Sequence, residues 1–418
     1  MKSMVIGLGP EYNYPGEFSK WREQNTRYAS NHGASFISRA LARQFDADYV
    51  DDFSDLDALR RTYDCCLIAF ASHVSDRRDV SLYADVVERL DMKTVAISLG
   101  IRDYSEDVGE LQSLHPSLIR LLRVVERSSE LIGVRGYYTA SLLQAYGFTN
   151  VVPVGCPTFF WNLKPELRIE KPATFSKPLV AYHRKMAVEN QDILKNTTIL
   201  GQDFLDEAVF TKNLVADTKL RELEGGEYRK LQNGQQILDV IGEWGVFPRN
   251  FQEWFTTIGN HDFVFGSRLH GTVAALVQGI PAVLIVRDVR TLEMARMFKI
   301  PHVTIAELKH MTKEQLYDAA DYSAFSSNYS LRYDNYLSVL EENGLSHKLA
   351  VSDPLPGYRV TPADMGLALE LVHKKVRRLE LELAHRRGFG FLPGGGKHRN
   401  PSGGVNAIGR LYRRMLGK

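Results

Sequence analysis

Short apolar runs alternate with helical patterns along most of this chain, and this alternation constrains the fold more than any other feature. It is clearest where the apolar residues 263–265 are followed by a helical run at 271–278 and a second apolar run at 282–286. Strands that alternate with helices are typical of βαβ units, whose strands lie parallel in one sheet. We therefore predict the α/β class with parallel sheets.

The alternation is interrupted once, at residues 161–176, which contain Pro165 and Pro172 and show little periodicity. We place a domain boundary there. The predicted parts are an N-terminal Rossmann-like domain (1–165), a C-terminal Rossmann-like domain that closes with a long helix at 361–387 (166–387), and a flexible basic tail with a short amphipathic helix (388–418). Two doubly wound domains that face a cleft form a GT-B-like arrangement.

Charge is distributed unevenly along the chain. The formal net charge is +2, which indicates no general polyanionic partner, so we expect no nucleic acid binding. Residues 373–418 hold twelve Lys or Arg and two Asp or Glu. The basic amphipathic pattern at 405–418 suits a peripheral contact with a membrane surface, although a disordered basic tail or a contact between subunits also fits it.

The cysteines and the hydropathy pattern indicate the cellular compartment of the protein. Three scattered cysteines form neither a disulfide framework nor a zinc cluster. No apolar run approaches the roughly 18 residues of a membrane span. We expect a cytoplasmic protein with peripheral contact at the inner face of the membrane, and no bound metal ion.

The segment Gly266-Ser267-Arg268-Leu269-His270-Gly271 follows the apolar run 263–265 directly. A ligand site commonly lies where a strand of a parallel sheet ends and the next helix begins. If the segment is extended, Arg268 and His270 point to the same side. Arginine then binds a carboxylate or phosphate, and histidine transfers a proton near neutral pH. The alternative is that both side chains bind carbonyl groups at the strand end.

Other strand ends supply further candidates. Arg290 follows the next strand and adds positive charge at the same sheet edge; the alternative is a capping Asp288 with solvated arginines. Arg135 ends a strand of the first half and would face the cleft from the opposite side, unless it is a surface residue. Asn31 and His73 are weaker candidates on the acceptor side.

With these residues in view, the chain resembles the polysaccharide pyruvyl transferase family. The resemblance covers roughly residues 1–310 and is strongest in the second half. It rests on the segments 262–272, 274–275, 279–282 and 287–293, and more loosely on 134–136, 142–143, 147 and 154–157.

The resemblance implies a GT-B-like fold, phosphoenolpyruvate as co-substrate and no further cofactor. Such an enzyme moves pyruvate onto two hydroxyls of a sugar, in an exopolysaccharide or its lipid-linked precursor, and forms a ketal. It further implies that His270 is the acid/base. The residues implied to bind the donor are Arg268, Leu269, Gly271, Arg135 and Arg290.

The chain departs from the family pattern at two turns. The common Gly-Asp-Pro turn is here Gly155-Cys156-Pro157, so no carboxylate role transfers to that position. The N-terminal Asn-x-Gly pattern is only partly matched by Asn31-His32-Gly33-Ala34. The acceptor sugar, the linkage and the oligomeric state stay open.

Two other functions fit the same pattern. The first is a GT-B glycosyltransferase that uses a nucleotide-sugar donor, with Glu293 as the acid that binds the ribose hydroxyls. The second is a non-catalytic protein that binds a membrane surface through its basic tail.

Overall fold

The computed structural model describes residues 1–10, 31–102, 113–183, 186, 191–203, 206, 210, 234–352, 354–367 and 370. The chain divides into two compact units, Met1–Leu371 and Val372–Lys418. The second unit lies outside the described residues, and so do the predicted tail 388–418 and most of the predicted helix 361–387. The domain boundary at residue 165 stays a prediction.

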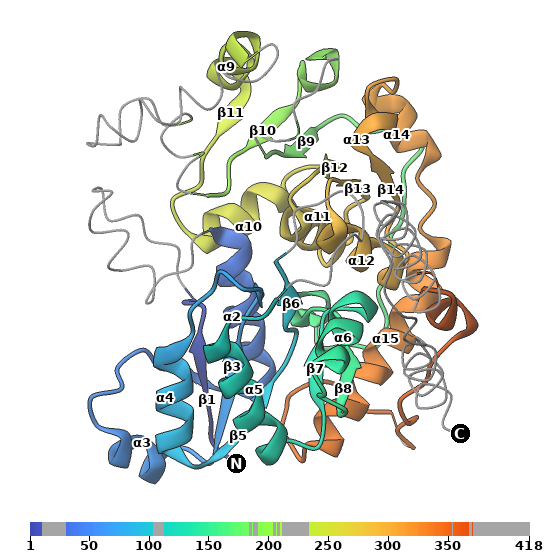
Figure 1. The fold of residues 1–418 in the computed structure, drawn as a ribbon. Helices are drawn as coiled ribbons and strands as arrows, with labels where there is room; N and C mark the ends of the chain where they lie inside the picture. The colour runs from blue at the N-terminus through green and yellow to red at the C-terminus, as the bar shows by residue number, and fades with distance from the viewer. Residues whose placement is uncertain are drawn as a thin grey trace, which may run out of the picture. The chain divides into compact units, whose positions relative to one another are not determined.

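The N-terminal half contains a parallel sheet with the strand order β2-β1-β3-β5 (Figure 1). Every residue of β1 and β3 is buried, as expected where helices cover both faces of a parallel sheet. Two further parallel pairs, β4 with β6 and β7 with β8, belong to this half. The strands are β1 (Ser3–Gly7), β2 (Asp48–Tyr49), β3 (Cys65–Ala69), β4 (Ser72–Val74), β5 (Lys93–Ala96), β6 (Gly100–Ile101), β7 (Ile132–Val134) and β8 (Val151–Pro153). The helices are α2 (His32–Phe45), α3 (Leu56–Thr62), α4 (Ser81–Leu90), α5 (Pro116–Ser128) and α6 (Tyr137–Ala145).

The C-terminal half contains a second parallel sheet, with the order β11-β10-β9-β12-β13-β14. Numbered along the chain, the strands have the 3-2-1-4-5-6 order of a Rossmann fold. The strand order reverses between β9 and β12, and this place is the switch point of the sheet. The prediction of an α/β fold with two Rossmann-like halves is therefore confirmed. The strands are β9 (Pro178–Ala181), β10 (Thr198–Leu200), β11 (Gly245–Val246), β12 (Phe263–Gly266), β13 (Ala282–Val286) and β14 (His302–Thr304). The helices are α9 (Gly234–Trp244), α10 (Phe251–Gly259), α11 (Leu269–Leu276), α12 (Val289–Phe298), α13 (Ile305–Leu308), α14 (Lys313–Ala319) and α15 (Ser323–Glu342).

A glycine brings β12 close to β9 at the switch point. Gly266 pairs with Ala181 and has φ +149°, a conformation that side chains rarely adopt. A Cβ at this position would lie 2.2 Å from the carbonyl oxygen of Ala181, so only glycine fits. The close approach determines where the next residues, Ser267 and Arg268, leave the sheet.

Side-chain caps fix the starts of three helices near this sheet edge. The Oδ1 atom of Asn31 accepts a hydrogen bond from the N–H of Ala34 at 2.9 Å and caps α2. Asn250 caps α10, and Asp288 caps α12 in a reciprocal capping box with Thr291. The interpretation of Asp288 as a helix cap is thus confirmed.

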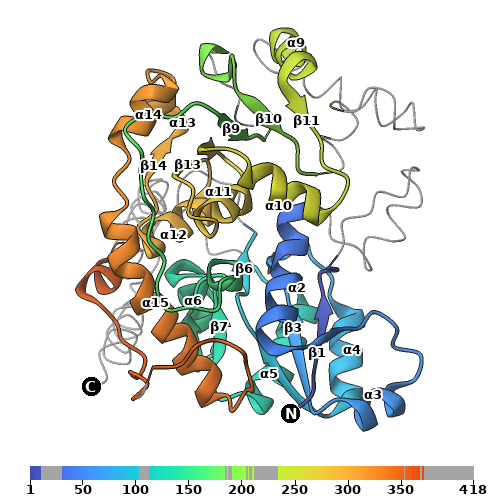
Figure 2. The same ribbon diagram turned by 180° about the vertical axis from the view of Figure 1, so that it is seen from behind.

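Helix α15 connects the two halves (Figure 2). The hydroxyl of Tyr336 donates a hydrogen bond to Oε1 of Gln44 in α2 at 2.7 Å. Just beyond the helix, Asn343 accepts from the N–H of Leu131 at 3.2 Å and donates to its carbonyl at 3.0 Å. The last long helix described thus contributes to the packing of the first half.

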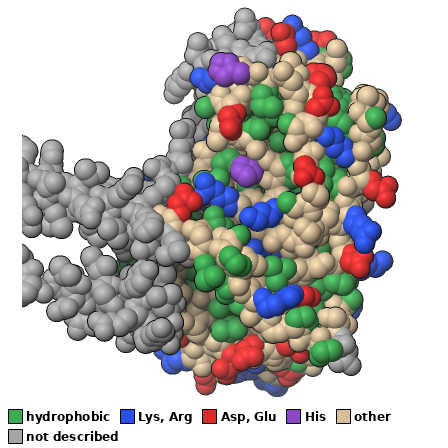
Figure 3. Space-filling view, turned by 90° about the vertical axis from the view of Figure 1, so that its right-hand side faces the viewer, with side chains coloured by type: hydrophobic (Ala, Val, Ile, Leu, Met, Phe, Trp, Pro, Cys, Tyr) green, Lys and Arg blue, Asp and Glu red, His purple; other side chains and the backbone are tan. Residues whose placement is uncertain are grey.

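The surface shows mixed charge on the face drawn in Figure 3, where Lys and Arg are interspersed with Asp and Glu. Among the helices that the structure describes, none is both long enough and apolar enough to span a lipid bilayer.

Candidate active site at the switch point of the second sheet

The segment after β12 places Arg268 and His270 at the switch point of the sheet. Arg268 is the N-cap residue of α11, and the helix begins at Leu269. The prediction that 268–270 form an extended segment is wrong, because the helix starts before His270. Helical positions are rotated by about 100° per residue, so the two side chains diverge and contact different partners.

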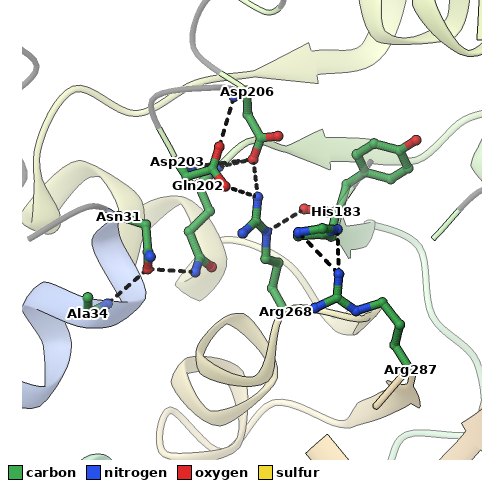
Figure 4. A network of polar contacts seen from close by, with 9 residues as sticks. Asn31, Ala34, His183, Gln202, Asp203, Asp206, Arg268 and Arg287 are labelled. Atoms are coloured by element: carbon green, nitrogen blue, oxygen red, sulfur yellow. Dashed lines mark hydrogen bonds and ion pairs between the residues drawn. The ribbon is translucent and has the colours of Figure 1, made fainter. Parts of the chain in front are cut away.

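Arg268 is held by two carboxylates (Figure 4). Its Nη2 atom lies 2.7 Å from Oδ2 of Asp203 and 2.5 Å from Oδ2 of Asp206. Its Nε atom donates to the carbonyl oxygen of Tyr182, just beyond β9, at 3.0 Å. The three charged side chains are 11%, 12% and 0% exposed, so this ion-pair cluster is almost dry. The alternative that Arg268 binds a carbonyl at a strand end is confirmed.

The same network reaches the N-terminal half through Gln202. The side-chain Nε2 atom of Gln202 donates to Oδ1 of Asn31 at 3.2 Å. The backbone carbonyl of Gln202 accepts a hydrogen bond from the backbone N–H of His32 at 3.2 Å. Asn31 thus caps α2 and joins it to the segment that carries Asp203 (Figure 4). In the structure, Asn31 occupies a contact between the halves.

A second arginine cluster follows β13. Arg287 places Nη1 2.9 Å from Nδ1 of His183, which follows β9, and Nη2 3.1 Å from Oδ2 of Asp288. Arg290 contacts the same carboxylate at 2.8 Å and donates to Oγ of Ser72 in β4 at 3.2 Å. Burial acts to raise the pKa of Asp288, but Arg290 and Arg287 outweigh it and lower that pKa. Arg290 therefore bridges the two halves.

Arg135 is a buried guanidinium at the end of β7, only 5% exposed. Its Nε atom lies 3.4 Å from Oγ of Ser98, whose φ of +68° is unusual for a residue with a side chain. Its Nη2 atom is buried and has no hydrogen-bond partner. Burial lowers the pKa of Arg135, and Arg290 lowers it further, while Cys156 and Glu293 oppose the shift. The interpretation of Arg135 as a surface residue is excluded.

His270 lies close to these cations. Its Nε2 atom is 3.7 Å from Sγ of Cys156, and its ring packs against Gly33 of α2, where a Cβ would come within 2.7 Å of the histidine Cβ. Burial lowers the pKa of His270 well below its usual value, and Arg135 and Arg290 lower it further. The resting imidazole is therefore neutral.

His73 of β4 belongs to the same electrostatic environment. Its ring stacks on Phe70 with 4.3 Å between the ring centres. Burial lowers the pKa of His73 to about 3, with further contributions from Arg78, Arg135 and Arg102. Its Nδ1 atom is buried without a hydrogen-bond partner. The structure thus brings His73 near Arg135, although the two were predicted for different substrates.

Leu269 and Gly271, the two other residues predicted to bind the donor, have roles in packing α11 against its neighbours. The side chain of Leu269 packs in the hydrophobic core. A Cβ at Gly271 would lie 2.5 Å from Cβ of Ala181, so glycine allows α11 to approach β9. Sequence patterns pointed to neither of these contacts.

Glu293 of α12 contacts the N-terminus of α6 in the other half. Its carboxylate accepts from the N–H of Thr139 at 2.9 Å and from the Thr139 hydroxyl at 3.2 Å. A Cβ at Gly136 would lie 2.2 Å from Cγ of Glu293. Burial raises the pKa of Glu293 to about 7, although the bonds from Thr139 and the charge of Arg135 oppose this. The carboxylate that a nucleotide-sugar enzyme would use for ribose thus caps a helix here.

Sequence reasoning missed the acidic partners Asp203 and Asp206, together with His183 and Ser98. Asp203 is 65 residues from Arg268 along the chain, and its segment has no helical or strand periodicity that would single it out. His183 carried a usable signal, because it follows a buried strand at the same sheet edge as Arg268.

Taken together, these residues can bind an anion beside a proton carrier. Arg135 and Arg290 supply positive charge and guanidinium N–H donors. His270 lies near both, and burial together with these two charges keeps its imidazole neutral. A bound anion would offset their charge and raise the pKa of the imidazole. The arrangement thus links anion binding to protonation of His270.

Two cavities of the described chain lie away from Arg135, Arg290 and His270, none of which lines either cavity. A cavity of about 670 Å³ lies between residues 166–171 and the start of α15, and a second, of about 40 Å³, is lined by Tyr137, Glu293 and Arg296 among others. Within the described ranges, no three His, Cys, Asp or Glu side chains are placed to hold a metal ion.

Comparisons with known proteins give one family. A family model described as polysaccharide pyruvyl transferase matches residues 19–289. No curated protein matches the chain.

Solved structures give weak likenesses. UDP-GlcNAc 2-epimerase of Methanocaldococcus jannaschii, in complex with UDP-GlcNAc and UDP, is 14% identical, with 89% of this chain and 100% of that chain covered and a TM-score of 0.35. The MnaA protein of S. aureus, solved with UDP, is 12% identical, with coverage of 86% and 100% and a TM-score of 0.42. UDP-N-acetylglucosamine 2-epimerase of Rickettsia bellii is 12% identical, with coverage of 91% and 98% and a TM-score of 0.33. Likeness at this level carries no argument about activity.

Proposed function

Since the chain belongs to the polysaccharide pyruvyl transferase family, we propose that it moves pyruvate from phosphoenolpyruvate to a sugar of a polysaccharide or of its lipid-linked precursor. Two hydroxyls of the sugar become a ketal. The observation that supports this proposal is the buried Nη2 atom of Arg135, which has no hydrogen-bond partner. Arg135 and Arg290 both act on His270.

The donor carries a carboxylate and a phosphate, and guanidinium groups are matched to both. Arg135 is nearly fully buried and has an unused donor atom. Arg290 is 19% exposed and shares one carboxylate, that of Asp288, with Arg287. Arg268, by contrast, is held by Asp203 and Asp206. We therefore assign most of the donor charge to Arg135 and Arg290, and Arg268 holds the switch point together.

His270 supplies the proton in this proposal. A proton moves from the imidazole to the methylene carbon of phosphoenolpyruvate while a sugar hydroxyl attacks the adjacent carbon. That carbon then releases inorganic phosphate, and the second hydroxyl closes the ketal. The two hydroxyl protons leave on phosphate and on the imidazole, so His270 returns to its starting state. Electrostatic stabilisation of the departing phosphate falls to the arginines.

Charge coupling explains how a histidine with a lowered pKa can act as an acid. Without donor, burial keeps His270 neutral, and the charges of Arg135 and Arg290 add to this effect. The anionic donor neutralises both cations and favours the imidazolium form. The acid is therefore charged when its substrate is present, which limits unproductive protonation in the resting enzyme.

The test uses the full chain with phosphoenolpyruvate and a panel of glycan and lipid-linked sugar acceptors. Phosphate release and the mass of the acceptor are measured together. We expect phosphate release that depends on one acceptor, with a matching pyruvate ketal in that acceptor. Turnover of a nucleotide sugar in place of phosphoenolpyruvate would contradict the proposal.

We further propose that residues 405–418 bring the enzyme to the membrane surface where lipid-linked acceptors are made. The support is their basic amphipathic sequence, since they lie outside the described residues. Sedimentation with anionic vesicles is expected for the full chain and not for a variant that ends at residue 387. Equal sedimentation of both chains, or none with anionic vesicles, would exclude this role.

A further inference from the structure

The imidazole of His270 is fixed between two segments of the N-terminal half. Its Nε2 atom lies 3.7 Å from Sγ of Cys156, which follows β8. A Cβ at Gly33 would lie 2.7 Å from Cβ and 2.9 Å from Nδ1 of His270, so the ring rests against a bare stretch of α2. The two ring nitrogens therefore face different neighbours: Nε2 faces the thiol, and Nδ1 faces the side of Gly33.

The thiol of Cys156 is itself oriented. The side chain is fully buried, and the hydroxyl of Thr158 donates a hydrogen bond to Sγ at 3.1 Å. With the sulfur oriented in this way, its S–H proton can point to Nε2 of His270, which is within reach. A neutral imidazole has one acceptor nitrogen and one N–H. Nε2 is then the acceptor, and Nδ1 carries the proton.

Cys156 also contacts Arg135, and this contact acts to raise the pKa of the guanidinium. Of the groups that act on the ring, Arg135 and Arg290 are cations, and no carboxylate appears among them. On the side of α2, the ring and the amide of Gln202 both lie against Gly33, and neither Gln202 nor Gly33 is charged. An acidic residue at position 156 would place a negative charge next to Nε2 and favour the imidazolium form at all times.

We propose that Cys156 is a positioning residue whose thiol fixes the orientation and tautomer of His270, so that Nδ1 is the nitrogen that delivers the proton. This inference rests on the proposed role of His270 as the acid. An anion bound by Arg135 and Arg290 would then favour the protonated form of His270.

The first test needs no substrate. The side-chain nitrogens of the histidines are labelled with ¹⁵N, and the His270 signals are assigned by their loss in His270→Gln. We expect Nδ1 to show the shift of an N–H nitrogen and Nε2 that of an acceptor in the wild type, and a mixture of tautomers in Cys156→Ala. A spectrum unchanged in Cys156→Ala would overturn the proposal. So would two protonated nitrogens together with thiolate absorbance, which would indicate an ion pair.

The second test separates positioning from binding. Cys156→Ala should lower kcat by about 10- to 100-fold, the cost of a misplaced reacting group, and leave KM for phosphoenolpyruvate within about twofold. The activity falls above a certain pH, and Cys156→Asp should raise that pH by about one to three units. Cys156→Ser, which keeps a hydroxyl donor, should recover part of the loss. Cys65→Ala, a buried cysteine of β3, is the matched control and should leave the pH profile unchanged.

The outcomes distinguish the two proposals. If the wild type releases no phosphate from phosphoenolpyruvate but the tautomer depends on Cys156, the proposed function fails and the positioning contact stands. Suppose instead that the wild type is active, and that Cys156→Ala shows a normal thermal unfolding curve and keeps both its kcat and its pH profile. The positioning role then fails, and the proposed function stands.

Discussion

The carboxylate of Glu293 lies at the N-terminus of α6 and accepts the N–H of Thr139 at 2.9 Å, so a side chain of the second half caps a helix of the first. Burial raises the pKa of this carboxylate to about 7. The unfolded chain has the ordinary, lower value, so between these two values the folded state binds the extra proton. The contribution of Glu293 to stability is then complete at acidic pH and is lost as pH rises through about 7.

Replacing Glu293 by Gln should remove this pH dependence. We expect the melting temperature of the wild type to fall relative to that of Glu293→Gln as the pH is raised from 5.5 to 8. This range includes the pKa of about 7 that Glu293 has in the folded state. Scanning calorimetry at several pH values measures it. Glu314→Gln, at an exposed position of α14, is the matched control and should follow the wild type. A difference that does not vary with pH would contradict the prediction.

His270→Gln should keep the fold and lose transfer. A positioned acid typically contributes about 10²- to 10⁴-fold to the rate, so kcat should fall by at least about 10²-fold. The assay is phosphate release from phosphoenolpyruvate with acceptor, beside a thermal unfolding curve. His310→Gln, at an exposed position after α13, should behave as the wild type. Turnover within a few-fold of normal in His270→Gln would rule out its role as the acid.

Arg135→Gln should weaken donor binding without unfolding the protein. A hydrogen bond to a charged group is worth roughly 1.5–3 kcal/mol, so KM for phosphoenolpyruvate should rise by about 10- to 100-fold. Because the guanidinium is buried with one atom unpartnered, its removal should cost little stability. Arg120→Gln, in an exposed pair on α5, serves as the control. An unchanged KM would place the donor elsewhere.

Arg268→Met should chiefly reduce stability. The change leaves the carboxylates of Asp203 and Asp206 without their cation in an almost fully buried site. Removing one partner of a buried ion pair lowers the free energy of unfolding by about 3–5 kcal/mol. Urea unfolding measures the loss, and adding Asp206→Asn should recover part of it. Arg120→Met, at an exposed pair, should cost no more than about 1 kcal/mol. A stable Arg268→Met protein with weakened donor binding would instead restore the direct donor role.

Gly33→Ala should disturb the position of His270. The added Cβ would meet Cβ of His270 and Nε2 of Gln202, each at 2.7 Å. Overpacking of this kind costs about 1–3 kcal/mol, and the imidazole must shift to relieve it. We expect kcat to fall further than stability alone explains, measured at a temperature well below melting. Gly366→Ala, where no atom lies within 4 Å of the new Cβ, should leave kcat unchanged.

The elements that the sequence predicted well are those with a single dominant signal. Helix α5 (Pro116–Ser128) has proline in its first turn and an amphipathic pattern, and strand β13 (Ala282–Val286) is an unbroken apolar run buried throughout. Helix α15 gave no such signal, because its buried residues mix apolar side chains such as Phe325 and Leu337 with tyrosines and the polar Arg332 and Asn335. Their partners lie in distant segments that no local pattern reveals.

The site was predictable in its residues but not in their contacts. Strand ends pointed to Arg135, His270 and Arg290 as candidates, and in the structure the charges of both arginines act on the histidine. The divergence of Arg268 from His270 depends on a helix that begins at Leu269, two residues before the predicted start at residue 271. A shift of one or two residues at a helix start is within ordinary boundary error, yet here it decides which partner each side chain finds.

The bonds between Asn343 and Leu131 have a consequence during synthesis. These residues are 212 positions apart, so at the usual elongation rate the ribosome needs roughly 10–40 s to make the second after the first. During that interval the start of β7 has neither its final donor nor its final acceptor. The first half of the chain therefore leaves the ribosome incomplete, and its last contacts close only when nearly the entire described chain has emerged.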